Sequence, residues 1–96
     1  MLILKSLSRG PMHGYGIAEH IHQMSEDVLE VEEGSLYPAL QRLLIQGWVS
    51  AEWGQSENNR RARFYRITSS GRKQLERELS EFYRVIRAIT RVIQTA

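Results

Sequence analysis

The chain lacks cysteine and long apolar runs. Among its 96 residues there is no cysteine, which excludes disulfides and thiolate metal sites. No stretch of about 18 apolar residues could span a membrane, and the N-terminus lacks the apolar core of a secretory signal. With 42% hydrophobic and 25% charged residues, the composition is that of an ordinary soluble domain. We therefore expect a single-domain cytoplasmic protein.

The residue sets that enzymes and metal sites use are also missing. We find no nucleophile–base pair, no glycine-rich phosphate loop and no set of spaced metal ligands. The histidines do not supply one, because His20 and His22 diverge on a helix and His13 lies before it. We expect no enzymatic activity, no bound metal and no cofactor.

Charge is distributed unevenly along the chain, although the formal net charge is only +2. Residues 1–59 hold three Lys/Arg and eight Asp/Glu, a balance of −5. Residues 60–96 hold ten Lys/Arg and three Asp/Glu, a balance of +7. Such asymmetry indicates that the second part faces an anionic partner.

A helix is predicted over about residues 34–46. Leu36, Leu40 and Leu43 recur at helical spacing, and Gly47 is a candidate C-terminal cap. Because proline has no backbone N–H, we expect Pro38 in the first turn. The remaining side chains include types that contact phosphates and base edges, namely Ser35, Tyr37, Gln41 and Arg42. The segment is either a plain core helix or a DNA recognition helix.

Two shorter helices are expected ahead of it, over Met1–Leu7 and from about Tyr15 to Met24. The first starts without any lead-in, so we expect that part of it precedes Met1. Tyr15 either donates to a phosphate or packs on the first helix. In the acidic segment 26–33, the apolar residues predict a brief strand at Val28–Val31. The carboxylates of this segment either complement the dipole of the next helix or accept a hydrogen bond from a cytosine amino group.

A β-hairpin is predicted next, with strands over residues 48–53 and 62–67 around a polar turn at 54–59. Four arginines with no acid among them occupy its tip and outgoing strand: Arg60, Arg61, Arg63 and Arg66. Guanidinium groups this close repel one another unless an anion lies between them. The arginines therefore either bind phosphates or form a solvated surface. We favour phosphate binding and call residues 54–63 the wing.

The last predicted helix starts after Thr68, a plausible N-cap, and runs to about Ile93. Its apolar residues are spaced by gaps of 4, 3, 4, 3 and 4, the heptad pattern of a coiled-coil seam. They are Leu75, Leu79, Phe82, Ile86, Ile89 and Ile93. A domain this small cannot cover such a seam, and packing on the first helix accounts for only part of it, so we predict a homodimer.

Together these elements predict a mainly α fold with a small β-hairpin. Residues 1–67 form a winged helix-turn-helix DNA-binding domain, and residues 68–96 form a C-terminal dimerisation helix. The competing interpretation is a winged helix that binds another protein through the acidic segment 26–33.

The chain also resembles the PadR family of bacterial transcriptional regulators, in the short subgroup with a single C-terminal helix. The resemblance covers nearly the whole sequence and lies in the motifs Leu2-Ile3-Leu4, Pro11-Met12-His13-Gly14-Tyr15, Gly34-Ser35-Leu36-Tyr37-Pro38-Ala39-Leu40 with Arg42-Leu43, Gly47, Arg60-Arg61, Tyr65-Arg66-Ile67-Thr68 and Gly71. It implies a homodimeric repressor that binds an inverted-repeat operator in double-stranded DNA. By position it implies helix-turn-helix contacts at Tyr15, Ser35, Tyr37, Pro38 and Arg42, and wing contacts at Arg60, Arg61 and Arg63.

Two features depart from the family pattern, and one is carried over from some of its members. Family members usually have several residues before the first apolar run, so we expect that part of the first helix, with some of its dimer contact, precedes Met1. Glu32 stands where the family often has a small polar capping residue, so a side-chain cap on the recognition helix is not assured. Some short members bind planar apolar compounds between their terminal helices. The similar positions here are Leu75, Leu79 and Phe82, which are either a pocket for a small aromatic effector or simple heptad packing.

Overall fold

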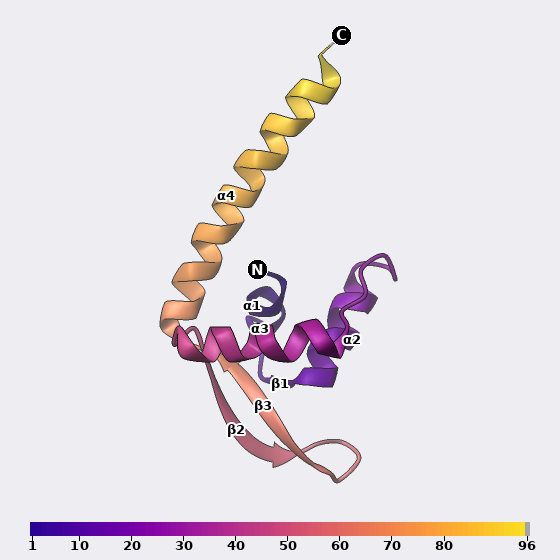
Figure 1. Ribbon diagram of the computed structural model, residues 1–96, viewed down its shortest axis with the longest axis vertical. Coiled ribbons are helices and arrows are strands. Elements are labelled where there is room, and N and C mark those ends of the chain that lie inside the picture. Colours follow the sequence, from indigo (N-terminus) through magenta and orange to yellow (C-terminus); the bar gives the residue numbers. More distant parts are fainter. Residues whose placement is uncertain (96) are drawn as a thin grey trace.

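The computed structural model describes residues 1–95, so Ala96 of the predicted dimerisation helix lies outside the described residues. The elements in chain order are α1 (Leu2–Leu7), β1 (Met12–His13), α2 (Gly14–Met24), α3 (Glu33–Ile45), β2 (Val49–Gln55), β3 (Arg61–Ile67) and α4 (Ser69–Gln94). In Figure 1, α4 projects from the body formed by the other elements, and the β2–β3 hairpin extends in the opposite direction. The predicted fold class, mainly helical with a small sheet, is confirmed.

One hydrophobic core joins the four helices to the base of the hairpin. Each of these elements supplies at least one buried side chain: Leu4, Leu7, Ile17, Ile21, Leu36, Leu40, Val49, Tyr65, Ile67 and Leu75. Leu36 and Leu40 of α3 are each only 1% exposed. Full burial of a leucine contributes about 1.5–3 kcal/mol, so these two residues anchor α3 and leave its opposite side in solvent.

The sheet has three antiparallel strands in the order β1-β3-β2. Strands β2 and β3 pair from Val49↔Ile67 out to Gln55↔Arg61, as the predicted hairpin requires. Strand β1 was not predicted, because two residues are too short to show a strand period; it pairs Met12 with Tyr65. This third strand ties the start of α2 to the hairpin.

Side chains alternate between the two faces of the hairpin. The face that continues the core carries Val49, Ala51, Trp53 and Gln55 on β2, and Arg61, Arg63, Tyr65 and Ile67 on β3. We call this the inner face. It is buried at its base and exposed towards its tip, so Arg61 and Arg63 extend outwards from the core side.

Helix α3 begins at Glu33, with the carbonyl of Glu32 accepting from the N–H groups of Ser35 and Leu36 at 3.0 and 2.9 Å. The Glu32 side chain makes no capping hydrogen bond. Pro38 lies inside the helix, in its second turn, so the prediction of a first-turn proline is wrong. Its missing N–H leaves the Gly34 carbonyl without a helical donor, and Gly34 is exposed, where water can replace that donor.

The end of α3 matches the prediction for Gly47. Its φ of +75° is the left-handed conformation that glycine adopts without steric cost. The Gly47 N–H donates to the Leu44 carbonyl and the Trp48 N–H donates to the Leu43 carbonyl, both at 3.0 Å. This is the Schellman arrangement, and it turns the chain directly into β2.

The predicted strand at Val28–Val31 is not formed. The chain leaves α2 through two left-handed residues, Glu26 and Asp27, with φ of 53° and 65°. The backbone of Leu29 then bonds back to α2: its N–H donates to Ser25 Oγ at 2.9 Å, and its carbonyl lies 3.1 Å from His22 Nδ1. Because these groups are satisfied locally, the segment has no strand partner, and Val28 is 79% exposed.

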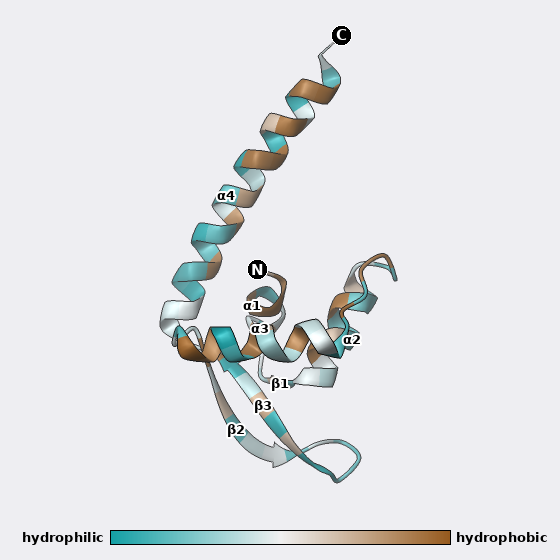
Figure 2. Ribbon diagram, in the orientation of Figure 1, coloured by the Kyte–Doolittle hydropathy of each residue, from teal (hydrophilic) through white to brown (hydrophobic). Residues whose placement is uncertain are grey.

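Helix α4 is capped as predicted, because Thr68 Oγ1 accepts from the Gly71 N–H at 3.0 Å. Its first turns pack on the body, where Leu75 is buried and Leu79 is half-buried. The N-terminal ammonium lies 3.3 Å from Glu78 Oε1, beside α1. From residue 80 to residue 95 every side chain is exposed, and Figure 2 shows hydrophobic residues recurring along this projecting part. Among residues 1–95, no helix is long and apolar enough to cross a membrane.

Candidate nucleic-acid interface

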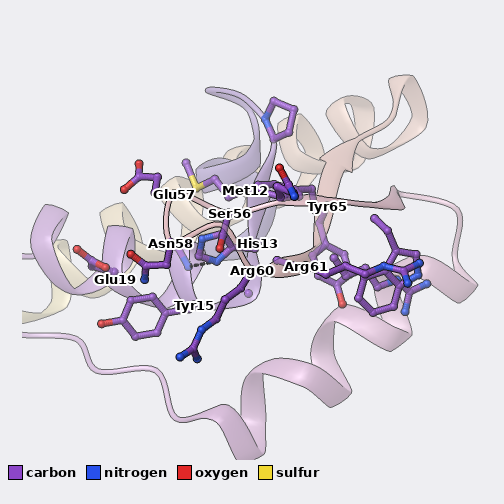
Figure 3. A pocket seen from close by; sticks show the side chains of 18 of the residues that line it. Met12, His13, Tyr15, Glu19, Ser56, Glu57, Asn58, Arg60, Arg61 and Tyr65 are labelled. Carbon is purple, nitrogen blue, oxygen red and sulfur yellow. Dashed lines mark hydrogen bonds between the residues drawn. The ribbon is translucent and has the colours of Figure 1, made fainter.

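A groove opens between the start of α2 and the inner face of the hairpin (Figure 3). Tyr15 contributes from α2, Tyr37 from α3, and Arg60, Arg61 and Arg63 from the hairpin. These five residues were all predicted from the sequence to contact DNA. The structure therefore brings side chains from three separated segments to one surface.

The outer side of α3 is the second part of this surface. Ser35, Pro38, Gln41 and Arg42 are all exposed, and at 3.6 residues per turn they fall within an arc of about 120°. Leu36 and Leu40 occupy the opposite side and hold the helix to the core. All four predicted contact residues of this face are thus available to a ligand.

Tyr37 lies at the border between the packed and exposed sides of α3. Its ring contacts the start of α2 so closely that a Cβ at Gly14 would lie 2.8 Å from the Tyr37 hydroxyl oxygen. Partial burial raises the pKa of Tyr37, with further contributions from Glu33 and Tyr65. The hydroxyl therefore remains protonated at neutral pH and can donate a hydrogen bond into the groove.

His13 has a role that sequence reasoning missed. Its Nδ1 accepts from the Gly16 N–H at 3.1 Å and caps α2, a position where Ser, Thr, Asp or Asn is more common. Accepting at Nδ1 puts the proton of the neutral ring on Nε2. The ring also meets Phe64 edge-on at 5.5 Å and stacks on Tyr15 at 6.3 Å between centroids. Tyr15 itself is 65% exposed, so it is not buried against α1.

The wing arginines lie on a surface without acidic partners. Within residues 1–95, no carboxylate forms an ion pair with Arg60, Arg61 or Arg63. Arg66 differs, because it lies on the other face of the hairpin and its Nη2 is 3.4 Å from Glu52 Oε1. The prediction of four acid-free arginines is therefore wrong for Arg66, which the strand register places diagonally across from Glu52.

Two aromatic rings support the arginines of the inner face. The guanidinium carbon of Arg61 lies 4.8 Å from the ring centroid of Trp53, and that of Arg63 lies 5.7 Å from the ring centroid of Tyr65. Such cation–π contacts hold the guanidinium groups beside the hairpin surface. In the part of the chain that the structure describes, no cluster of three potential ligands could hold a metal ion.

Comparison with known proteins places this geometry in a family. The sequence profile described as "Transcriptional regulator PadR-like family" matches residues 3–77. A transcriptional regulator from Clostridium thermocellum is 27% identical and has a TM-score of 0.88, with 97% of this chain and 90% of that chain covered. An uncharacterised protein in transposon TN4556 of Streptomyces fradiae is 40% identical over 85 residues, which are 88% of this chain and 23% of that protein.

A further structure shows the same fold. It is PadR from Bacillus subtilis in complex with operator DNA, at 23% identity and a TM-score of 0.71, with 81% of this chain and 44% of that chain covered. The family profile spans most of the chain, from α1 into the core-packed part of α4. The chain therefore belongs to the PadR-like family of transcriptional regulators.

Proposed function

We propose that the protein binds double-stranded operator DNA as a homodimer and acts as a transcriptional repressor. The observation that carries this proposal is the continuity of two surfaces. The exposed polar side of α3 adjoins, through Tyr37, a groove lined by three arginines without acidic partners. The Bacillus subtilis PadR, whose structure includes operator DNA, supports the same use of the fold.

Helix α3 would act as the recognition helix. Its 13 residues span about 20 Å, and a helix fits the major groove of B-DNA. Gln41 and Arg42 are the residue types that read adenine and guanine edges, whereas Ser35 is suited to a phosphate oxygen. Pro38 offers only apolar contact, for which a thymine methyl group is a partner.

The arginines and the tyrosines would fix the protein on the backbone of the duplex. Arg60, Arg61 and Arg63 supply charge-assisted hydrogen bonds to phosphates flanking the major-groove contact. Tyr15 and Tyr37 supply neutral hydroxyl donors at the groove. These contacts set register and orientation, and they make affinity depend on salt.

Dimerisation would cover the projecting part of α4. Phe82, Ile86 and Ile89 are between 41% and 48% exposed, and Ile93 is 76% exposed. They continue the heptad that Leu75 and Leu79 start against the chain's own core. A second copy of α4 would bury this seam by coiled-coil packing, and a two-fold dimer matches an inverted-repeat operator.

The same seam is the proposed place for a small aromatic effector. Phe82 is 41% exposed and meets Tyr83 edge-on, with 5.5 Å between the ring centroids. Between two such helices, a planar ligand would stack on Phe82 next to Leu79.

The test is binding to DNA from upstream of the protein's own gene. The anisotropy of a labelled duplex is followed across a salt series, with an unrelated duplex of equal length as control. We expect tighter binding to the upstream duplex and a steep fall of affinity with salt. Absence of saturable binding to duplexes tiling the neighbouring promoters would contradict the proposal and favour a winged helix that binds proteins through segment 26–33.

A further inference from the structure

Trp53 is an exposed aromatic residue that the core does not explain. It lies on the inner face of the hairpin, opposite Arg63 in the strand register, and it is 60% exposed. The core on this face ends at Tyr65 and Ala51, one position closer to the base. Because most of the Trp53 side chain stays in solvent, it adds little hydrophobic stabilisation to the fold. The contacts of its ring therefore indicate its role.

The guanidinium group of Arg61 lies over the Trp53 ring, with the guanidinium carbon 4.8 Å from the ring centroid. The five N–H donors of a guanidinium group lie in its plane. A guanidinium held over an indole therefore keeps its donors at its rim, where a phosphate can accept two of them. A free arginine side chain must lose much rotamer freedom to do the same.

The second arginine of this face provides an internal comparison. Arg63 lies over Tyr65 at 5.7 Å, but Tyr65 is 5% exposed and belongs to the core. Its ring would be present whatever Arg63 does. Trp53 has no such core role among the described residues, and the charged group that lies over its ring is the guanidinium of Arg61.

We propose that Trp53 is a positioning residue for DNA binding, which holds Arg61 so that its N–H rim meets a backbone phosphate beside the recognition helix. This inference rests on the proposed function. Trp53 acts through Arg61 rather than on DNA itself, so the two side chains form one unit of the interface (Arg61 is labelled in Figure 3).

A double-mutant cycle tests this coupling in the full chain. The affinity for the upstream duplex is measured for Trp53→Leu, Trp53→Phe, Arg61→Ala and the double variant Trp53→Leu/Arg61→Ala. Leucine keeps apolar bulk without a π face, whereas phenylalanine keeps the face. We expect Trp53→Leu to weaken binding about two- to fivefold per protomer, as an exposed cation–π contact implies, and Trp53→Phe to retain most of the affinity.

The decisive result is the effect of Trp53→Leu in the Arg61→Ala background. We expect no further loss there, because the arginine that Trp53 positions is gone. An equal loss in both backgrounds would overturn the proposal and assign Trp53 a contact of its own, and so would wild-type affinity in Trp53→Leu. Melting temperatures, expected to match the wild type, separate binding from folding. Failure of the wild type to bind duplex DNA would instead contradict the proposed function.

Discussion

Replacing Gly71 with alanine should destabilise the protein, although alanine is the better helix former. A Cβ at position 71 would lie 2.0 Å from the Trp48 carbonyl oxygen and 2.9 Å from Ile67 Cγ1, both far inside van der Waals contact. The start of α4 would have to move away from the Trp48 carbonyl, which accepts from the Thr68 N–H at 3.0 Å. It would also strain the hydrogen bond from Thr68 Oγ1 to the Gly47 carbonyl at 2.7 Å.

The magnitude of the change in stability follows from two destabilising terms and one stabilising term. Overpacking typically costs about 1–3 kcal/mol, and the loss of a hydrogen bond costs about 1 kcal/mol. The higher helix propensity of alanine offsets about 1 kcal/mol. The free energy of unfolding should therefore fall by about 2 kcal/mol, which lowers the melting temperature of a domain this size by about 8–16 °C.

Gly34→Ala is the matched control. Gly34 also lies in a helix, but a Cβ there would meet nothing within 4 Å. This variant should melt at or slightly above the wild-type temperature, since alanine restricts the unfolded chain and favours the helix. Circular dichroism melts at one fixed protein concentration compare the three proteins, because the proposed dimerisation would make the melting temperature depend on concentration. A Gly71→Ala variant as stable as Gly34→Ala would refute the packing argument.

Three further predictions concern the proposed dimer, the cap of α2 and base recognition. If the proposed dimer forms through α4, Ile86→Asp should yield monomers in light scattering, with dimer affinity at least about 100-fold weaker because two carboxylates would meet at the seam; a persistent dimer would place the interface elsewhere. His13→Ala should lower stability by about 1 kcal/mol in urea unfolding, whereas His13→Asn, which keeps a capping acceptor, should lose less; equal losses would show that ring packing matters instead. Gln41→Ala should change which operator sequence is preferred in a competition assay, and uniform weakening on all sequences would limit Gln41 to positioning.

Local sequence patterns were sufficient to predict the helices, the C-terminal end of α3 and the N-terminal end of α4. Leu36 and Leu40 predicted the buried side of α3 because helical spacing alone determines which residues share a side. Gly47 and Thr68 predicted helix ends because helix caps depend on residues close together in the sequence. A glycine that adopts a left-handed conformation ends a helix, and a hydroxyl group that accepts from a nearby backbone N–H begins one. The exposed side of α3 follows from the same spacing, and the DNA contacts of its residues stay predictions.

Several features that the sequence did not predict depend on contacts between distant segments. Strand β1 exists because His13 and its neighbour meet β3, about 50 residues later. The pairing of Arg66 with Glu52 depends on the strand register, and so does the approach of Arg61 to Trp53. Pro38 was misplaced because the burial of two leucines outweighs one lost helical hydrogen bond.

The most direct measurement is the salt dependence of operator binding by the wild type and by a variant with Arg60, Arg61 and Arg63 all replaced by alanine. The slope of log affinity against log salt should become shallower by about 0.9 for each lost phosphate contact, hence by at most about 2.7 per protomer. The preferred operator sequence should remain the same, because in the proposed interface the arginines contact the backbone and α3 reads the bases. An unchanged slope would show that DNA does not meet this face of the hairpin and would contradict the proposed interface.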